Sequence, residues 1–387
     1  MMTSYETALK RLFDLSPLPK LGLERMSLLM ADLGNPQNTY PAFHVAGTNG
    51  KGSTCAFLEA ILRSAGYKTG LYTSPHLTCA RERIQINREL ISEEDFVRLE
   101  QKVSLNATFF ERMTAMAFLY FAEQKVDVAV IEVGLGGRLD ATNIIKPIVC
   151  GISRIDLDHQ NILGDTLEQI AVEKAGIIKS DVPVCWSPQD PVVEHVLRSF
   201  SPSSQGGEEL GVRSGLELGL HGLHQKDNAL LAVNMIQASG ISVSEFAMQN
   251  GLKNTKWPCR YELISENILL DGAHNPAGTK ALINALPKQN FVLWVGMTEG
   301  HGGEEIARLW ADFAPNSKVF VGQSKSLRAL PTQIVKQYFE TAGFKRVSCD
   351  NPTQQDALLV VTGSLYWAGE IRSRLTKMPV DSFSTYY

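Results

Sequence analysis

The 387-residue sequence lacks the patterns that mark membrane proteins and nucleic-acid-binding proteins. No stretch reaches the roughly 18 consecutive apolar residues that a membrane-spanning helix needs, and the N-terminal residues contain no apolar h-region. No run of Lys and Arg occurs, and the net charge is −4. A weakly acidic chain without a basic cluster is a poor partner for nucleic acid. We therefore expect a cytoplasmic protein with neither a membrane nor a nucleic-acid partner.

The six cysteines are scattered along the chain and include no CxxC pair. Several of them lie in apolar strand candidates, where a free thiol behaves as a small hydrophobic group. This pattern predicts buried free cysteines, not disulfides or a zinc site. Internal repeats and low-complexity segments are also absent.

What the sequence does contain is typical of an α/β protein of two domains. Hydrophobic residues make up 44% and charged residues 20%, and the length allows two cores. Apolar runs alternate with helical patterns, which predicts mainly parallel sheets. The expected strands are 42–46, 69–73, 126–133, 147–152 and 182–186, followed by 267–271, 290–296, 317–321 and 357–361.

A domain boundary is expected near residue 256, because Trp257-Pro258 interrupts a helical pattern and a new strand series follows it. The prediction is a P-loop ATPase domain over 1–256 and a smaller Rossmann-like α/β domain over 257–387. The polar stretch 201–215 reads as a surface loop.

The segment FHVAGTNGKGST (43–54) predicts a strand, a glycine-rich turn and a helix over 53–65. Gly47, Gly50 and Gly52 let backbone N–H groups approach an anion, and Lys51 can supply a charge to the β- and γ-phosphates. Ser53 or Thr54 can offer a hydroxyl to Mg²⁺. Because Gly52 separates the lysine from the hydroxyl residue, the spacing departs from the usual P-loop, and a generic glycine-rich loop is the alternative.

Three other strand ends point to the same edge of the sheet. Glu132 lies near the end of the apolar strand VDVAVIEV, where it is either a metal ligand or part of a buried salt bridge. Ser74 follows strand 69–73 in a turn that can face the nucleotide. Asp156, Asp158 and His159 follow strand 147–152, and His159 is a metal ligand or a solvated loop residue.

Lys174 falls on the apolar face of a helix that begins near Thr166 with a capping-box pattern. The face is marked by Leu167, Ile170, Ala171 and Ile178. Either the lysine extends its ammonium to the surface, or it is buried near a phosphate or metal.

In the second domain, strand 267–271 ends in Asp271, His274 and Asn275, again at the functional edge of a parallel sheet. Arg260 stands near the domain boundary, where it can reach a phosphate. His224, Gln225 and Asn228 lie near the start of a helix, where they contact a base or ribose or simply cap the helix.

Together these segments resemble the Mur-ligase superfamily and, within it, the folylpolyglutamate synthase/dihydrofolate synthase family. The matching motifs run in order along nearly the whole chain: LGLERM (21–26), HVAGTNGKGST (44–54), GLYTSPHL (70–77), ERIQIN (82–87), TFFERMTAMAFLYF (108–121), EVGLGGRLDATN (132–143), LDHQNILGDTLEQIAVEKAGIIK (157–179), HQKDNAL (224–230), WPCRYE (257–262), LDGAHNPAG (270–278) and VTGSLYWAGEIR (361–372).

The resemblance implies the ligands and the roles of individual residues. It implies an ATP site of Gly47, Thr48, Asn49, Gly50, Lys51, Gly52, Ser53, Thr54, Asn228, Arg260 and Asp271. It implies two Mg²⁺ ions with ligands among Ser53, Ser74, Glu132 and His159, and leaves a monovalent cation open. It implies a carbamylated Lys174, catalytic roles for Lys51, Lys174, Arg260 and His274, and a dihydropteroate or folate pocket of Thr108, Phe110, Asp140 and Ala141.

The implied activity is an ATP-dependent amide ligase that acts through an acyl phosphate. L-glutamate is joined to dihydropteroate, to the glutamate tail of a reduced folate, or to both, by a monomeric enzyme. The alternatives are a folylpolyglutamate-only enzyme, a peptidoglycan Mur ligase, a P-loop switch or transport ATPase, and a degenerate folate-binding protein. A GTPase would carry an NKxD motif, which is absent.

One departure from the family lies in the second domain. Relatives often carry Asp-Lys-Asp after the strand that corresponds to FVLWVGM, whereas this chain reads TEGHGG, with Glu299 and His301. In addition, the loop around 201–215 is short, and Cys259 stands where glycine is common.

Overall fold

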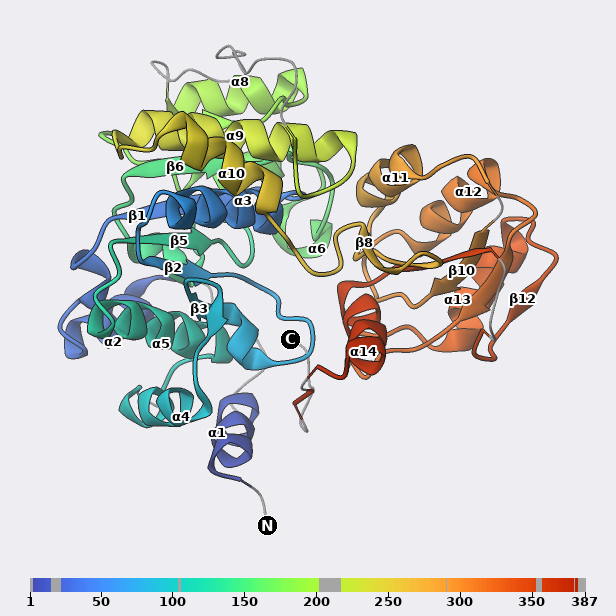
Figure 1. Ribbon diagram of the computed structural model, residues 1–387, viewed down its shortest axis with the longest axis horizontal. Helices are drawn as coiled ribbons and strands as arrows, with labels where there is room; N and C mark the ends of the chain where they lie inside the picture. The colour runs from blue at the N-terminus through green and yellow to red at the C-terminus, as the bar shows by residue number, and fades with distance from the viewer. Residues whose placement is uncertain are drawn as a thin grey trace. The chain divides into compact units, whose positions relative to one another are not determined.

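A computed structural model of the protein describes residues 3–14, 22–103, 106–201, 217–289, 291–352, 357–378 and 380–381. The chain forms two compact units (Figure 1). The first comprises Met1–His76, Ala80–Gly219 and Gln225–Lys256, and the second comprises Leu77–Cys79, Leu220–His224 and Trp257–Tyr387. The loop predicted over 201–215 lies, apart from Ser201, outside the described residues.

The first unit is built on a seven-stranded sheet with the order β4-β3-β2-β5-β1-β6-β7. The strands β2, β5, β1, β6 and β7 are parallel, and β3 and β4 are added antiparallel at one edge. The strands are β1 (Ala42–Ala46), β2 (Thr69–Tyr72), β3 (Ile84–Ile86), β4 (Glu89–Leu90), β5 (Val128–Glu132), β6 (Val149–Ile152) and β7 (Val184–Trp186). The five parallel strands were predicted, while β3 and β4, at this edge of the sheet, lack the apolar runs that mark buried strands.

Helices surround this sheet: α1 (Ser4–Phe13), α2 (Glu24–Asp32), α3 (Lys51–Ser64), α4 (Glu93–Lys102), α5 (Phe109–Glu123), α6 (Gln160–Leu163), α7 (Leu167–Ala175), α8 (Pro191–Phe200), α9 (Leu223–Ser239) and α10 (Glu245–Asn254). Three short 3-10 helices, η1 (Pro36–Asn38), η2 (Ala80–Arg83) and η3 (Ala141–Ile144), complete the unit. Helix α3 packs on β1, β2 and β5, and α10 packs on α3. The approach of α10 is close: a Cβ at Gly251 would lie 2.5 Å from Ile61 Cα.

Two helix ends explain how the functional residues are placed. Helix α3 begins at Lys51, two residues earlier than predicted, because Gly50 takes a left-handed conformation (φ 94°) just before it. Helix α7 has the predicted capping box between Thr166 and Gln169. It ends at Ala175, so Ile178 packs from the following segment and not from the helix.

The second unit is a six-stranded sheet with the order β12-β11-β10-β13-β9-β8. All its neighbouring strands are parallel except β8, which pairs antiparallel with β9. Its elements are β8 (Glu262–Ser265), β9 (Ile268–Leu270), α11 (Pro276–Ala285), β10 (Phe291–Val295), α12 (Gly303–Phe313), β11 (Lys318–Val321), α13 (Thr332–Thr341), β12 (Val347–Ser348), β13 (Leu358–Thr362) and α14 (Leu365–Thr376). The short strands β8 and β12 were not predicted. The predicted α/β class with mainly parallel sheets is confirmed.

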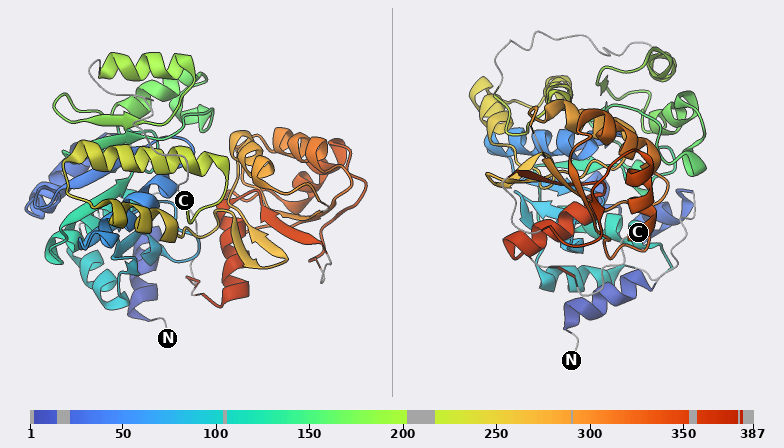
Figure 2. Two further views of the ribbon diagram at one scale, coloured as in Figure 1. Left: turned by 45° about the horizontal axis from the view of Figure 1, so that its top comes forward. Right: turned by 90° about the vertical axis from the view of Figure 1, so that its right-hand side faces the viewer.

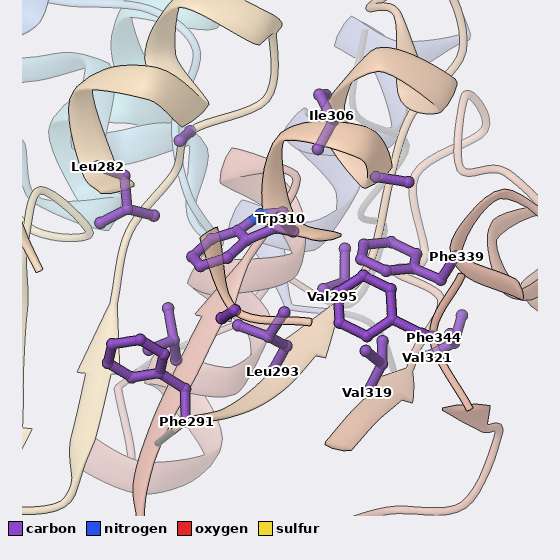
Figure 3. Close-up of a cluster of buried hydrophobic side chains, with 14 of the residues drawn as sticks. Leu282, Phe291, Leu293, Val295, Ile306, Trp310, Val319, Val321, Phe339 and Phe344 are labelled. Carbon is purple, nitrogen blue, oxygen red and sulfur yellow. The ribbon is translucent and has the colours of Figure 1, made fainter. Parts of the chain in front are cut away.

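Alternating side chains give this sheet two apolar faces, as the period of a strand requires. Phe291, Leu293 and Val295 of β10 face a core formed with α11, α12 and α13 (Figure 3). The intervening Trp294 packs with Trp367 of α14 on the other face, where their rings are 5.1 Å apart. Figure 2 shows these helices on the two sides of the sheet.

Two further expectations from composition can be compared with the described residues. Within them, five of the six cysteines are buried as free thiols, and Cys349 is exposed. The same residues include no helix of the length and hydrophobicity needed to cross a bilayer.

Trp310 is the largest fully buried side chain of the second unit, at the centre of the cluster in Figure 3. We expect Trp310→Ala to lower the free energy of unfolding of this unit by about 3–5 kcal/mol, because it leaves a large cavity. Hydrogen exchange of β10 and β13 would measure the loss. Leu327→Ala is the matched control, since Leu327 is 70% exposed; equal effects of the two changes would contradict the assigned core.

Candidate functional site

The carboxyl edge of the first sheet collects the loops that sequence reasoning singled out. Strand β1 lies between β5 and β6, and the register places Val45 opposite Glu132 and Ala46 opposite Ile152. The loop that begins at Gly47 therefore lies beside the end of β5 and the start of the loop after β6. In open α/β sheets, ligands bind at such an edge, where neighbouring connections diverge.

We call residues 47–50, between β1 and α3, the phosphate loop. Close packing requires glycine at two of its positions. Gly47 has a φ of 145°, and a Cβ there would lie 2.0 Å from Ser153 Oγ. Gly50 has a φ of 94°, and a Cβ there would lie 2.2 Å from Asn228 Oδ1. No L-residue with a side chain fits these positions without moving its neighbours. Asn228 is itself buried and donates from Nδ2 to Gln225 Oε1 at 3.0 Å.

The loop after β6 braces the phosphate loop. The N–H groups of Thr48 and Asn49 donate to the Arg154 carbonyl at 2.9 and 3.1 Å. Asn49 Nδ2 donates to Asp156 Oδ2 at 2.9 Å, and the Thr48 hydroxyl donates to the Asp156 carbonyl at 3.0 Å. These two N–H groups are thus committed to the protein, so an anion would be bound by the first turn of α3, whose N–H groups have no acceptor within the helix.

Two lysine amines meet at one carbonyl oxygen. Lys51 Nζ donates to the carbonyls of Gly47 (3.2 Å) and Thr48 (3.3 Å), and Lys174 Nζ donates to the same Gly47 carbonyl at 2.8 Å. Lys51 is the first residue of α3 and half-buried, which corrects its predicted place in the glycine-rich turn before the helix; the left-handed Gly50 allows this early start.

Lys174 is buried, with only 4% of its surface exposed, which is the second of the two alternatives left open by its place on an apolar helix face. Burial, followed by the nearby charge of Lys51, lowers the pKa of its amine from 10.5 to about 7, which Asp158 and Asp140 partly oppose. A substantial fraction of Lys174 is therefore a neutral amine near pH 7.

Of the predicted metal ligands, the structure brings Ser74 and Glu132 together. The Ser74 N–H donates to Glu132 Oε2 at 3.0 Å, and Glu132 is buried at the end of β5. Ser53 is buried in the first turn of α3. His159 caps α6 in a left-handed conformation (φ 52°), and its N–H donates to Asp158 Oδ1 at 2.9 Å.

The four residues expected in the pterin pocket occupy helix starts. Thr108 caps α5 through a capping box with Glu111, and Asp140 caps η3, in which Ala141 is the first residue. Phe110 is half-buried; its ring lies 6.1 Å from that of Tyr72, and a Cβ at Gly134 would be 2.4 Å from its Cζ. Phe110 therefore lies directly over the backbone that follows β5.

In the second unit, Arg260, Asp271 and His274 lie around Gly272 at the end of β9. Asp271 accepts from the N–H groups of Tyr261 and Ala273, both at 2.8 Å. His274 Nδ1 is 2.9 Å from the Gly272 carbonyl, and Arg260 Nη1 donates to the Cys259 carbonyl at 3.0 Å. A Cβ on Gly272 would lie 2.6 Å from Arg260 Nη1, so the arginine can occupy this position only because residue 272 has no side chain.

The segment that departs from the family lies beside His274. The His301 ring is 5.0 Å from that of His274 at 81°, and Gly300 and Gly302 take left-handed conformations (φ 85° and 72°) on either side of His301. Arg328 Nη2 braces the turn by donating to the Glu299 carbonyl at 2.9 Å. The same turn lines a cavity of about 530 Å³, also bordered by Arg308 and Tyr338.

Several residues near the carboxyl edge of the first sheet were not predicted from the sequence. Ser153 and Arg154 shape the phosphate loop, and the buried pair Arg83 and His76 joins at 2.8 Å through Arg83 Nε and His76 Nδ1. The motif ERIQIN contains Arg83, but nothing in its pattern indicates which residue its side chain meets. Such contacts depend on tertiary packing.

Comparisons with known proteins agree with this architecture. The Mur ligase middle domain matches residues 45–186. The dihydrofolate synthase/folylpolyglutamate synthase of Bacillus subtilis is 35% identical, with 92% of this chain and 95% of the relative covered. A folylpolyglutamate synthase structure from Thermotoga maritima has 34% identity, a TM-score of 0.84, and 97% and 98% of the two chains covered. An Escherichia coli FolC structure in complex with DHPP and ADP has 28% identity, a TM-score of 0.87, and 97% and 99% coverage.

A two-sheet α/β fold with a phosphate loop at the end of β1 defines the Mur ligase type of architecture. The chain belongs to the dihydrofolate synthase/folylpolyglutamate synthase family.

Substitution of Lys51 tests whether the phosphates of ATP bind at the phosphate loop. We expect Lys51→Ala to lower the rate of ATP consumption about a hundredfold, roughly 3 kcal/mol, because it removes a charge that stabilises the transferring phosphoryl group. ADP release measures this effect, and exposed Lys146→Ala is the charge-matched control. Near-normal turnover of Lys51→Ala would place the nucleotide elsewhere.

Proposed function

We propose that the protein is an ATP-dependent ligase that joins L-glutamate to a pteroate-type carboxylate. The observation that carries the proposal is the meeting of Lys51 and Lys174 at the Gly47 carbonyl, in the loop after β1. Buried Glu132 stands at the end of the neighbouring strand β5, opposite Val45. Two amines at the start of α3 and a carboxylate on the next strand suit phosphoryl transfer, which depends on positioning and charge stabilisation. Membership of the family supports the same reaction.

The reaction has two steps. A carboxylate oxygen of the acceptor attacks the γ-phosphorus of ATP, and the P–O bond to ADP breaks to give an acyl phosphate. The amine of L-glutamate then attacks the acyl carbon, phosphate leaves, and the amine loses its proton. We assign Lys51 and Arg260 to the phosphate oxygens, Asn228 and Asp271 to the nucleotide, and His274 to the proton of the amine.

Magnesium fits the oxygen-rich donor set at the first edge. The buried carboxylate of Glu132 and the hydroxyls of Ser53 and Ser74 are the hard ligands that Mg²⁺ prefers, and we add His159 as a further ligand. We propose two ions; when bound, they neutralise phosphate charge. A monovalent cation is a further candidate, and we propose that the protein acts as a monomer.

We propose that Lys174 is carbamylated, and its burial supports this modification. The neutral amine attacks CO₂, an N–C bond forms, a proton leaves, and the product is an anionic carbamate. A pKa of about 7 makes the free amine available near neutral pH. The modification replaces a cation that burial disfavours with oxygen ligands suited to a metal, so it accounts for a lysine on an apolar face.

The acceptor pocket is proposed at Phe110, with Thr108, Asp140 and Ala141 around it. A half-buried aromatic ring can stack on a flat pterin. Both dihydropteroate and tetrahydrofolate are candidate acceptors, and an enzyme restricted to folates is the second candidate function.

ADP release, measured with Mg-ATP, L-glutamate and either dihydropteroate, tetrahydrofolate or no acceptor, tests the proposal. We expect release to depend on an acceptor and on glutamate. Activity with tetrahydrofolate alone would select the folate-only enzyme. Release that needs neither acceptor would indicate a simple ATPase and contradict the ligase assignment.

Lys174 provides a pH-dependent prediction. Because only the free amine reacts with CO₂, carbamylation should rise from pH 6, where about one tenth of a pKa 7 amine is neutral, to pH 8, where about nine tenths is neutral. ¹³C NMR of the protein in ¹³CO₂-bicarbonate would show a carbamate signal that is absent from Lys174→Ala.

Lys174→Ala should fold, since it removes a buried group that is costly to charge, but it should lose most activity. A short carboxylate in the buffer should restore part of it by filling the vacated oxygen positions. An active Lys174→Ala enzyme, or a wild-type protein without the carbamate signal at pH 8, would overturn this role.

A further inference from the structure

A chain of buried hydrogen bonds runs from the middle of the first sheet toward the proposed acceptor pocket. It begins at His44 in β1, which is fully buried. His44 Nε2 is 2.8 Å from Thr142 Oγ1, and Thr142 Oγ1 is 2.5 Å from Asp140 Oδ1. Thr142 is fully buried and Asp140 is nearly so.

The chemistry of the three side chains determines which group donates in each of these hydrogen bonds. Burial raises the pKa of Asp140, but three backbone N–H groups donate to its two oxygens and favour the ionised form. An ionised carboxylate can only accept, so the Thr142 hydroxyl donates its proton to Asp140. The hydroxyl oxygen is then left to accept, so His44 Nε2 must carry a proton and donate. Burial, followed by the charge of Lys179, lowers the pKa of His44 to about 3, so the ring stays neutral and its Nδ1 is unprotonated. Nδ1 has no hydrogen-bond partner in the part of the chain that the structure describes.

Asp140 passes the restraint on to the backbone. Its Oδ1 also accepts from the Thr142 N–H at 3.0 Å, and its Oδ2 accepts from the N–H groups of Gly134 and Leu135 at 3.1 and 2.9 Å. Four donors thus hold one carboxylate in a single orientation. Gly134 in turn lies directly under the Phe110 ring.

We propose that His44 and Thr142 are positioning residues that set selectivity for the acceptor, by holding Asp140 and, through it, the Gly134–Leu135 backbone on which Phe110 lies. This inference rests on the proposed function, since it assumes that Phe110 lines the acceptor pocket. It assigns Asp140 an organising role through the backbone, in addition to any contact with the acceptor.

A purely structural role would be served more simply by apolar residues. Burying an imidazole, a hydroxyl and a carboxylate costs free energy that packing alone does not return. These hydrogen bonds hold the loop after β5, at the carboxyl edge of the sheet where we propose that the ligands bind. They do not hold a connection at the opposite edge of the sheet.

The test compares Thr142→Val, which removes the hydroxyl but keeps the shape, with Thr142→Ser, which keeps the hydroxyl. We expect Thr142→Val to raise KM for dihydropteroate roughly tenfold, the effect of about one lost hydrogen bond, and KM for ATP by no more than about twofold. Thr142→Ser should stay near the wild-type values. His44→Gln, which can donate from a similar position, should fall between them.

Imidazole ¹⁵N–¹H correlation spectra supply an independent readout. They should show His44 as the Nε2–H tautomer in the wild type and a shifted signal in Thr142→Val, assigned by its loss in His44→Gln. Gly134→Ala, which displaces Phe110 but keeps the backbone N–H that donates to Asp140, should reproduce the rise in KM but leave the His44 signal unchanged.

Equal rises in both KM values, or unchanged kinetics in a folded Thr142→Val protein, would overturn the inference while leaving the ligase assignment intact. If Thr142→Val does not fold, a Nδ1–H tautomer of His44 in the wild type would overturn it. A wild-type enzyme that acts on no pteroate acceptor would instead contradict the proposed function, which the ADP-release assay detects separately.

Discussion

The close approach of Gly47 to Ser153 is the constraint on which the carboxyl edge of the first sheet depends. A Cβ at Gly47 would lie 2.0 Å from the serine hydroxyl, so the phosphate loop can lie against the loop after β6 only because residue 47 is glycine. That approach lets Arg154 and Asp156 accept from the loop, and it leaves the Gly47 carbonyl facing both lysine amines. The arrangement of charge follows from backbone packing.

Burial then decides the chemistry of the groups at this edge. Lys174 and Glu132 are buried, and an uncompensated charge is costly there. The amine is therefore expected to be neutral or modified, and the carboxylate to be paired or bound to a cation. For Lys174, burial and the neighbouring Lys51 lower the pKa of the amine to about 7. A surface lysine with the same neighbours in sequence would keep an ordinary pKa and remain an ammonium ion.

The carboxyl edges of the two sheets differ in how closely their sequences match the family motifs. In the first unit, the phosphate loop, Glu132 and the Asp140 segment match the family motifs closely and form a densely bonded edge. In the second unit, the turn around His301 stands where the resemblance led us to expect Asp-Lys-Asp, and it lies against His274. Two left-handed glycines and Arg328 hold this turn, so the segment has a defined local structure.

Much of this protein could be predicted from the sequence by itself, because local patterns carry the information. Apolar runs located the long parallel strands, the capping box located α7, and the spacing on that helix placed Lys174 on a buried face. The strands β3, β4, β8 and β12 were missed, because they lie at or next to a sheet edge and lack the apolar runs that mark the buried parallel strands. Only the tertiary structure decided that Lys51 and Lys174 share one carbonyl and that His44 reaches Asp140 through Thr142. Lys174 is 127 residues from Gly47, and His44 is 98 residues from Thr142, so sheet order and not sequence spacing brings these pairs within hydrogen-bond distance.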